Sequence, residues 1–239
     1  MLRHEHKMVI SQSQYIVLSA RMRALMTPDS HMPSAQGYLI SSLYFDDAQE
    51  SAYYEKLSGS AERKKYRLRI YNGALSRIRL ECKYKAADRI DKRSALVGED
   101  VYRALVRGGM RALADVDDPL CREVYGLSAS RLLTPRVVVS YLREAYVHPL
   151  SNTRITFDKQ LRAGWTKEAM QSIWRDDVPV FPTGEFPIPD AVILEIKYDE
   201  YIPKFITDAL QTGGQVLAAS KYVLCRDALY LLGRRYVTT

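Results

Sequence analysis

Charged and apolar side chains alternate without interruption through residues 77–85. The charged residues are Arg77, Arg79, Glu81, Lys83 and Lys85. Because successive side chains of a strand point to opposite faces, this alternation predicts a strand with one charged face and one apolar face. Cationic side chains bind phosphate oxygens, and carboxylates bind divalent metal ions. The charged face therefore has the chemistry to hold a polyanion together with a metal ion.

The same alternation recurs in four other segments of the chain. They are Glu5–Lys7, Arg67–Ile70, Arg154–Asp158 and Leu194–Lys197. One such strand is more often an ordinary surface strand with its charges in water. Five of them predict a sheet with a whole charged side. A flat sheet would expose that side to water, whereas a closed barrel would turn it inward around an ionic ligand and place helices on its apolar side.

The elements that must position these residues are mostly strands. We expect strands at residues 3–10, 38–46, 63–71, 76–85, 89–97, 136–147, 152–163 and 190–198. We expect helices at residues 11–26, 47–57, 99–107, 119–133, 203–210 and 219–232, with irregular segments at 27–37 and 164–189. Ser11 and Gln14 have the spacing of a capping box, and Asn72-Gly73 is typical of a tight hairpin turn. These patterns predict an α+β fold.

Size and charge narrow the classes of partner. With 239 residues, 47% apolar composition and 17 tyrosines, the chain is expected to bury one large core as a single domain over residues 1–239. It has 35 basic and 28 acidic side chains, a net charge of +7. Such a balance favours anionic partners, namely nucleotides, nucleic acid or an acidic membrane surface.

Cysteine usage and hydropathy indicate a cytoplasmic protein. Cys82, Cys121 and Cys225 are far apart and form no CxxC pair, which favours three buried, reduced thiols. No apolar run approaches the roughly 20 residues that span a bilayer, and the N-terminus lacks the apolar region of a signal peptide. A membrane-protein partner could still tether the chain.

Nine segments, taken in order, resemble a known family. They are Glu5–Lys7, Ser42–Asp46, Arg67–Arg69, Leu80–Lys83, Lys92, Tyr141–Tyr146, Arg154–Asp158, Leu194–Lys197 and Ser220–Tyr222. Together they resemble the VTC domain, the polyphosphate polymerase domain of the vacuolar transporter chaperone complex and a branch of the triphosphate tunnel metalloenzymes. The resemblance implies an antiparallel β-barrel tunnel with a charged lumen and outer helices. It also implies transfer of the γ-phosphoryl group of ATP onto polyphosphate with Mn²⁺ or Mg²⁺.

The resemblance also implies roles for individual residues. Seven basic residues are expected to act on the transferred phosphates: Lys7, Arg67, Arg69, Lys83, Arg143, Arg154 and Lys197. Lys92, Ser220 and Lys221 are expected to bind phosphate, Ser220 from the start of the last helix, where free backbone amides favour an anion. Glu195 is expected to hold the metal, with Glu81, Glu5 and Asp158 as further metal candidates.

One departure from the wider superfamily bears on the reaction. Many tunnel metalloenzymes begin with Glu-x-Glu-x-Lys, and here Arg3 stands at the first Glu position, before Glu5 and Lys7. The VTC branch also lacks the full acidic motif, so the resemblance implies a polymerase rather than a two-metal hydrolase, and the smaller number of carboxylates disfavours a second metal ion. His4 and His6 alternate with Glu5 and Lys7, so we expect them on the other face in a structural or exposed role.

Two alternatives to the polymerase remain open. The first is a metal-dependent hydrolase of tripolyphosphate or nucleoside triphosphates. The second is a non-catalytic polyphosphate-binding module. Nucleic-acid binding is disfavoured, because the basic residues alternate with apolar ones on strands and no aromatic platform accompanies them.

Overall fold

The structure is a computed structural model that describes residues 4–86, 89–164, 192–211 and 220–237. The chain divides into two compact units, which are described separately. The first unit comprises Met1–Leu39, Tyr141–Leu161 and Pro187–Ala219; the second comprises Ile40–Ser140, Arg162–Phe186 and Ser220–Thr239.

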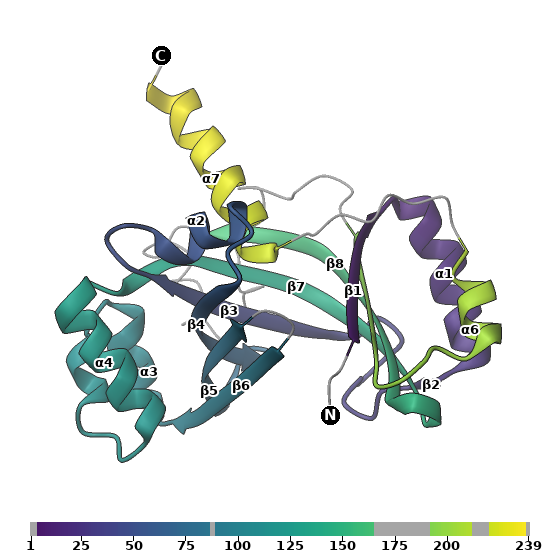
Figure 1. Cartoon of the computed structure of the whole chain (residues 1–239), viewed down its shortest axis with the longest axis horizontal. Coiled ribbons are helices and arrows are strands. Elements are labelled where there is room, and N and C mark those ends of the chain that lie inside the picture. The colour runs from purple at the N-terminus through teal and green to yellow at the C-terminus, as the bar shows by residue number, and fades with distance from the viewer. Residues whose placement is uncertain (1–3, 87–88, 165–191, 212–219, 238–239) are drawn as a thin grey trace. The chain divides into compact units, whose positions relative to one another are not determined.

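The described residues form helices and strands in a mixed order (Figure 1). The strands are β1 (His4–Ile10), β2 (Thr27–Pro28), β3 (Tyr38–Asp46), β4 (Glu62–Tyr71), β5 (Ala74–Ala86), β6 (Arg89–Val97), β7 (Thr134–His148), β8 (Thr153–Gly164) and β9 (Val192–Tyr198). The helices are α1 (Gln12–Leu25), α2 (Ser51–Leu57), α3 (Glu99–Val106), α4 (Pro119–Arg131), α6 (Lys204–Ala209) and α7 (Lys221–Val237), with 3-10 turns η1 (Met110–Leu113) and η2 (Leu150–Asn152). The strands hydrogen-bond in the order β1-β9-β8-β7-β3-β4-β5-β6, and β2 pairs with β7.

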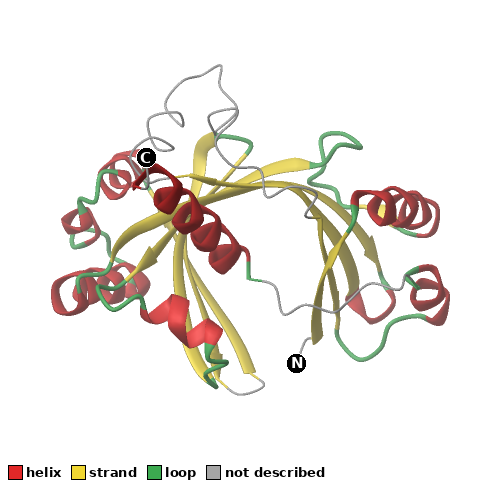
Figure 2. Ribbon diagram, turned by 90° about the horizontal axis from the view of Figure 1, so that it is seen from above, coloured by secondary structure: helices red, strands yellow, loops and turns green. Residues whose placement is uncertain are grey.

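In the first unit, helices cover the apolar face of antiparallel strands (Figure 2). Ile155 and Phe157 of β8 and Leu194 and Ile196 of β9 point to the same face and are buried. Leu18 of α1 belongs to the same core cluster, as do residues of α6. The alternate side chains of these strands, which include Arg154 and Glu195, therefore point to the opposite face.

A buried carboxylate ties α1 to β7 in this unit. Glu144 is fully buried on β7 and accepts hydrogen bonds from the hydroxyls of Tyr15 (2.6 Å), Ser19 (2.5 Å) and Tyr146 (2.6 Å). The ammonium of Lys159 lies 2.8 Å from the same carboxylate. Burial by itself raises the pKa of Glu144, but these donors outweigh it and the pKa is lowered. This network fixes the helix on the face away from Arg154 and Glu195.

In the second unit, β4, β5 and β6 form an antiparallel meander with helices on one face. Asn72 (φ 50°) and Gly73 (φ 69°) make the turn between β4 and β5, and positive φ at both positions is what a two-residue hairpin of this kind requires. Leu68, Leu80 and Ala95 of the three strands are buried. Helices α3 and α4 pack against this meander and lie side by side (Figure 1). Both helices contact η1.

Most expected elements are confirmed with shifted ends. The capping box at Ser11 is present, since Ser11 Oγ accepts from the Gln14 amide and the Gln14 side chain accepts from the Ser11 amide. Two expectations need correction. The segment 27–37, which we expected to be irregular, contains the short strand β2. Helix α2 begins at Ser51 and not at residue 47, because the Asp47 side chain accepts amide hydrogen bonds in a turn that precedes the helix. The expected irregular segment 164–189 lies almost wholly outside the described residues, and the last helix, expected at 219–232, is α7, which begins at Lys221.

Two sequence-based expectations about side chains are also met. All three cysteines are free and buried. His4 and His6 stack on Tyr198 and do not point with Glu5 and Lys7. Among the residues that the structure describes, none of the helices has the length and apolar content to cross a bilayer.

Candidate phosphate-binding site

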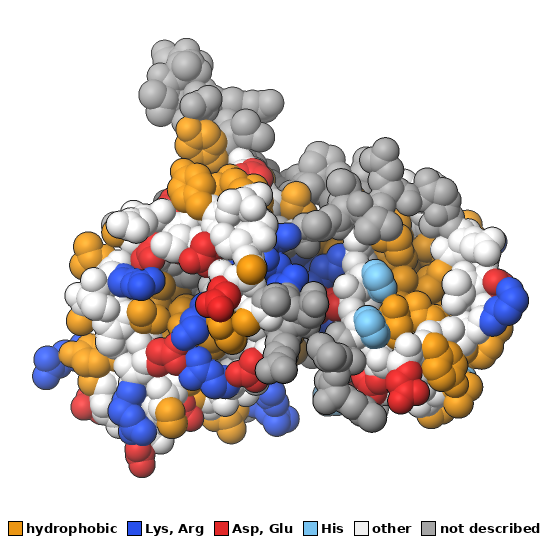
Figure 3. Space-filling view, viewed as in Figure 1, with side chains coloured by type: hydrophobic (Ala, Val, Ile, Leu, Met, Phe, Trp, Pro, Cys, Tyr) orange, Lys and Arg blue, Asp and Glu red, His pale blue; other side chains and the backbone are white. Residues whose placement is uncertain are grey.

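The face of β4, β5 and β6 opposite the helices is strongly basic. We call it the basic face and define it by Lys65, Arg67, Arg69, Arg79, Lys83, Lys92 and the single carboxylate Glu81. Strand register pairs Arg67 with Glu81, Arg69 with Arg79, and Lys83 with Lys92. In Figure 3, basic and acidic side chains are interspersed around β5 and β6 on the visible side of this unit. Cross-strand pairs of like charge are destabilising, so this face favours an anion.

Three cations of the basic face contact the carboxylate of Glu81. Its side chain is 1% exposed, and its carboxylate lies 2.7 Å from Arg67 Nε, 3.7 Å from Arg69 Nη1 and 2.6 Å from Lys92 Nζ. Burial by itself raises the pKa of Glu81, but the three cations outweigh it and hold the pKa at about 2. The carboxylate is therefore ionised near neutral pH and fixes the guanidinium of Arg67 before any ligand binds.

Hydroxyl groups of β3 complete the positioning of the two arginines. Arg67 Nη1 donates to Tyr44 Oη at 3.0 Å, and Arg69 Nε donates to Ser42 Oγ at 3.2 Å. Burial raises the pKa of Tyr44, but the charges of Arg67, Arg69 and Lys221 outweigh it and the pKa is lowered. Tyr44 therefore contacts a basic residue of the predicted site.

Helix α7 begins beside these residues within the second unit. Ser220 stands immediately before the helix, and Lys65 Nζ donates to Ser220 Oγ at 3.0 Å. Two further contacts anchor the helix: Tyr222 Oη donates to Asp46 at 2.5 Å, and Tyr53 Oη donates to Asp227. Asp46 also accepts a hydrogen bond from the Ala52 amide in the first turn of α2, at 2.9 Å.

In the first unit, β1 and β9 carry four charged residues in alternating order. Glu5 pairs with Lys197 and Lys7 pairs with Glu195 across the two strands. Lys7 Nζ contacts Glu5 and lies 3.6 Å from Glu195 Oε2, and Lys197 contacts Glu195 as well. Burial lowers the pKa of Lys197 although Glu195 opposes that effect. Four of the predicted site residues therefore share one ion-pair network.

The two predicted site arginines of the first unit, Arg143 and Arg154, each contact a buried carboxylate. Arg143 makes two parallel contacts with Asp158, at 2.7 and 2.8 Å. Although burial opposes it, the Asp158 charge raises the pKa of Arg143 well above its ordinary value. Arg154 Nη2 lies 2.8 Å from Asp29, a residue that the sequence did not single out. Asp29 is positioned by its amide, which donates to the Ala145 carbonyl at 2.9 Å.

The oxygen donors around Glu195 suit a hard divalent cation. Glu5 and Glu195 contact the same ammonium, that of Lys7, so both carboxylates lie close to one point. Thr156 pairs with Glu195 across β8 and β9, and its hydroxyl is buried without a hydrogen-bond partner in the described part of the chain. Within those residues no three His, Cys, Asp or Glu side chains gather as a metal site. A cation here would take its other ligands from phosphate oxygens and water, as Mg²⁺ usually does.

The predicted site residues fall into two groups, one in each unit. The first unit holds Glu5, Lys7, Arg143, Arg154, Asp158, Glu195 and Lys197. The second holds Arg67, Arg69, Glu81, Lys83, Lys92, Ser220 and Lys221. Their assigned roles, and the expectation that they line one lumen, stay predictions. Sequence reasoning missed Lys65, Asp29 and Thr156; of these, only Lys65 had a clear signal, because it continues the alternation of Arg67 and Arg69 toward the N-terminus.

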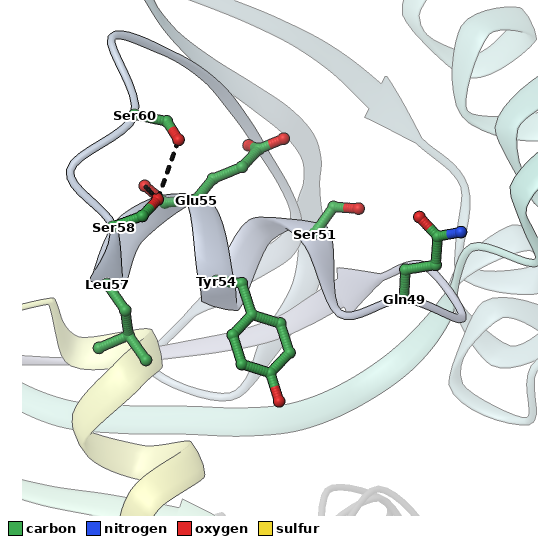
Figure 4. Close-up of a pocket in the computed structure, with 7 residues that line it drawn as sticks. All are labelled: Gln49, Ser51, Tyr54, Glu55, Leu57, Ser58 and Ser60. Carbon is green, nitrogen blue, oxygen red and sulfur yellow. Dashed lines mark hydrogen bonds between the residues drawn. The ribbon is translucent and has the colours of Figure 1, made fainter.

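A surface hollow of about 480 Å³ runs along α2 but does not have the chemistry of a phosphate site (Figure 4). It is lined by Gln49, Ser51, Tyr54, Glu55, Leu57, Ser58 and Ser60. Glu55 is the only charged residue in this lining, and burial together with the charges of Asp46 and Asp47 raises its pKa. An anion would be repelled there.

Comparisons with known proteins agree with this geometry. A family model described as the VTC domain matches residues 2–230. No curated protein matches the chain. Among solved structures, the fold is similar to that of a Hippeastrum protein, described as a candidate adenylyl cyclase with a dominant triphosphatase activity. The sequence identity is 12% and the TM-score is 0.56, and the alignment covers 95% of this chain and 96% of the Hippeastrum chain. That likeness confirms the expected α+β triphosphate tunnel fold class.

Two bacterial structures are less similar. A candidate adenylate cyclase from Bacillus halodurans has 9% identity and a TM-score of 0.43, covering 100% of this chain and 93% of that one. Another from Vibrio parahaemolyticus has 11% identity and a TM-score of 0.41, covering 99% and 88%.

Proposed function

Because the chain belongs to the VTC domain family, we propose that it transfers the γ-phosphoryl group of ATP onto a growing polyphosphate chain. The observation that carries this proposal is the basic face, where Lys and Arg side chains of three adjacent strands surround one buried carboxylate, Glu81. Such an excess of positive charge on a partly buried surface favours a ligand with several linked negative charges.

The chemistry needs positioning and positive charge more than it needs covalent help. In phosphoryl transfer, negative charge is spread over the equatorial oxygens of the moving group, and fixed cations stabilise it. Arg67 and Arg69 have planar guanidinium groups that bind phosphate in a bidentate manner, and Glu81, Tyr44 and Ser42 orient them in advance. The attacking oxygen of a polyphosphate end is already ionised, so no general base is required.

The proposal includes a divalent cation, Mn²⁺ or Mg²⁺. Glu195 and Glu5 would hold it, and Thr156 would hold one of its waters. When bound, the cation neutralises phosphate oxygens and the leaving group. Lys7 and Lys197 both contact Glu195 and would share its negative charge with the cation.

Hydrolysis of tripolyphosphate or nucleoside triphosphates is the second candidate. It is favoured by the triphosphatase activity described for the Hippeastrum protein, whose fold is similar. Against it stands Arg3 at a position where many two-metal tunnel hydrolases carry a glutamate. A non-catalytic polyphosphate-binding module is the third candidate, and it predicts tight binding without turnover.

Product analysis separates these candidates. The full chain is incubated with ATP and Mn²⁺ or Mg²⁺, and the products are resolved on a gel and assayed for orthophosphate. A polymerase gives ADP and long phosphate chains, a hydrolase gives ADP and orthophosphate without chains, and a binding module gives none of these. An Arg67→Met variant should lose turnover. Orthophosphate as the only phosphate product would overturn the proposed polymerase.

A further inference from the structure

The segment between β2 and β3 is fastened to β7 at several points. Strand β2 pairs with β7, and the next residue, Asp29, donates its amide to the Ala145 carbonyl at 2.9 Å. Near the other end of the segment, the backbone of Gly37 lies against β7, because a Cβ added there would stand 2.1 Å from the Arg143 carbonyl oxygen. The segment therefore holds Asp29 at a fixed place beside β7.

The carboxylate of Asp29 joins this segment to β8. It is buried, and its Oδ1 atom accepts from the His31 amide at 2.9 Å and lies 2.9 Å from His31 Nδ1. Its Oδ2 atom lies 2.8 Å from Arg154 Nη2. Burial by itself raises the pKa of Asp29, but the hydrogen bonds from His31 and the charge of Arg154 outweigh it, and the pKa is lowered. One carboxylate oxygen thus serves the turn, and the other serves Arg154.

Arg154 lies on the charged face of β8 and β9, beside the proposed cation site. It pairs with Lys197 across the two strands and points to the same face as Glu195. Its Nη2 atom also donates to Tyr38 Oη at 3.2 Å. The contacts with Asp29 and Tyr38 both use Nη2, so they restrict the guanidinium without using Nη1.

The other predicted site arginine of this unit is held in a different way. Arg143 uses both Nε and Nη2 to contact Asp158, at 2.7 and 2.8 Å. Its side chain is 12% exposed, whereas that of Arg154 is 31% exposed. A guanidinium that is paired with a carboxylate in this bidentate way has fewer donors left for phosphate. Arg154 is therefore the better placed of the two to bind a phosphate oxygen while its carboxylate partner stays in place.

A carboxylate beside a phosphate-binding arginine has two opposing effects. Its charge repels phosphate, whereas its contact orders a side chain that would otherwise lose rotamer freedom when the ligand binds. We propose that Asp29 is a positioning residue, which holds Arg154 by Nη2 so that Nη1 is presented to a phosphate of the ligand. The ordering effect outweighs the repulsion. This inference rests on the proposed function and adds to it a residue that neither the charge alternation nor the family resemblance assigned.

Calorimetric titration of the full chain with tripolyphosphate tests the sign of the effect. The variants are Asp29→Asn and Asp29→Ser, each of which keeps an oxygen that can accept from the His31 amide and so preserve the turn. Both should bind tripolyphosphate about tenfold more weakly than the parent chain, because the guanidinium must then be ordered by the ligand. The matched control is Asp117→Asn, which removes the same charge from a side chain that is 98% exposed and should bind as the parent chain does.

A double-mutant cycle shows whether Asp29 acts through Arg154. Arg154→Met removes the arginine, so adding Asp29→Asn to it should cause no further loss of tripolyphosphate affinity. A change that merely damaged the fold would weaken binding in both backgrounds. A further loss of about tenfold in the double variant would therefore overturn the positioning role. Thermal melts without ligand show which variants are folded, and Asp29→Ser takes the place of Asp29→Asn in the cycle if the latter is not.

The results separate this inference from the proposed reaction. Equal or tighter binding in the folded Asp29 variants overturns the role of Asp29, even if the parent chain makes polyphosphate from ATP. An equal loss in Asp117→Asn also overturns it, as does a failure of both Asp29 variants to fold, which would make the residue a requirement of the fold alone. A loss that is confined to the Asp29 variants and vanishes in the Arg154→Met background supports it, even if product analysis finds hydrolysis instead of polymer. A parent chain without measurable affinity for tripolyphosphate overturns the inference together with the phosphate role of Arg154.

Discussion

Replacing Glu81 with glutamine removes the carboxylate that holds three cations on the basic face. Lowering the pKa of Glu81 from an ordinary 4.5 to about 2 corresponds to about 3 kcal/mol of folding free energy, at 1.36 kcal/mol for each tenfold change. The side chain is 1% exposed, so solvent screens this interaction little. For a chain of this length, we expect the melting temperature of Glu81→Gln to fall by about 6–12 °C near pH 7.

A polyanion should restore much of that loss. Without Glu81, Arg67, Arg69 and Lys92 lose the carboxylate that they share, and tripolyphosphate can replace its negative charge. Scanning calorimetry in chloride, with and without tripolyphosphate, measures the increase in melting temperature that the ligand causes. This increase should be larger in Glu81→Gln than in the parent chain.

Glu123 provides the matched control for Glu81. It also has a pKa of about 2, because Arg93, Tyr66 and Lys64 outweigh the effect of burial, but it lies on the helical face. Glu123→Gln should therefore lower the melting temperature without enlarging the increase that tripolyphosphate causes. If the ligand raises the melting temperature of all three proteins equally, the basic face is not its binding site.

The pH dependence of the Glu81→Gln effect has a defined sign. The folded pKa of Glu81 lies below the unfolded value, so its contribution is complete above about pH 4.5 and is lost as the pH falls toward 2. The difference in stability between the parent chain and Glu81→Gln should shrink across that window. A difference that stays constant down to about pH 2 would contradict the assignment of an ionised, cation-bound Glu81.

Three further predictions concern the backbone, the metal and the thiols. Gly37→Ala should lower the melting temperature of the protein more than Gly59→Ala does. Both glycines have positive φ, but a Cβ added at Gly37 would lie 2.1 Å from the Arg143 carbonyl oxygen, whereas a Cβ added at Gly59 would meet nothing within 4 Å. Equal losses would show that this close approach is unimportant. Glu195→Gln should weaken Mn²⁺ binding in the presence of tripolyphosphate by at least about tenfold in a calorimetric titration, and unchanged affinity would remove Glu195 as a ligand. The three buried cysteines should react with a thiol reagent at mildly alkaline pH only after unfolding, since burial raises the pKa of each, that of Cys121 to about 11; rapid reaction of the folded chain would contradict their burial.

Local patterns predicted the strands of the two charged faces well. The alternation of charged and apolar residues predicted β5 and β9, and Asn72-Gly73 predicted the hairpin between β4 and β5. These signals depend on neighbouring residues alone. For the same reason, the alternation correctly separated Glu5 and Lys7 from the two histidines beside them.

Partners distant in sequence could not be predicted in this way. The salt bridge between Asp29 and Arg154 depends on β2, whose two residues pair with β7 more than a hundred residues away. The contact of Lys92 with Glu81 depends on the register of β5 and β6, which the alternation alone leaves undetermined. Lys65 was missed for a different reason: its position in the alternation was readable, but its contact with Ser220 was not.

A crystal structure of the full chain with a non-hydrolysable ATP analogue and Mn²⁺ tests the central claim most directly. If the basic face binds linked phosphates, phosphate oxygens will lie within about 3 Å of Arg67 and Lys83, and the Arg67–Glu81 contact will be lengthened or shared. Triphosphate bound away from the face defined by β4, β5 and β6, with the Arg67–Glu81 contact unchanged, would contradict the claim.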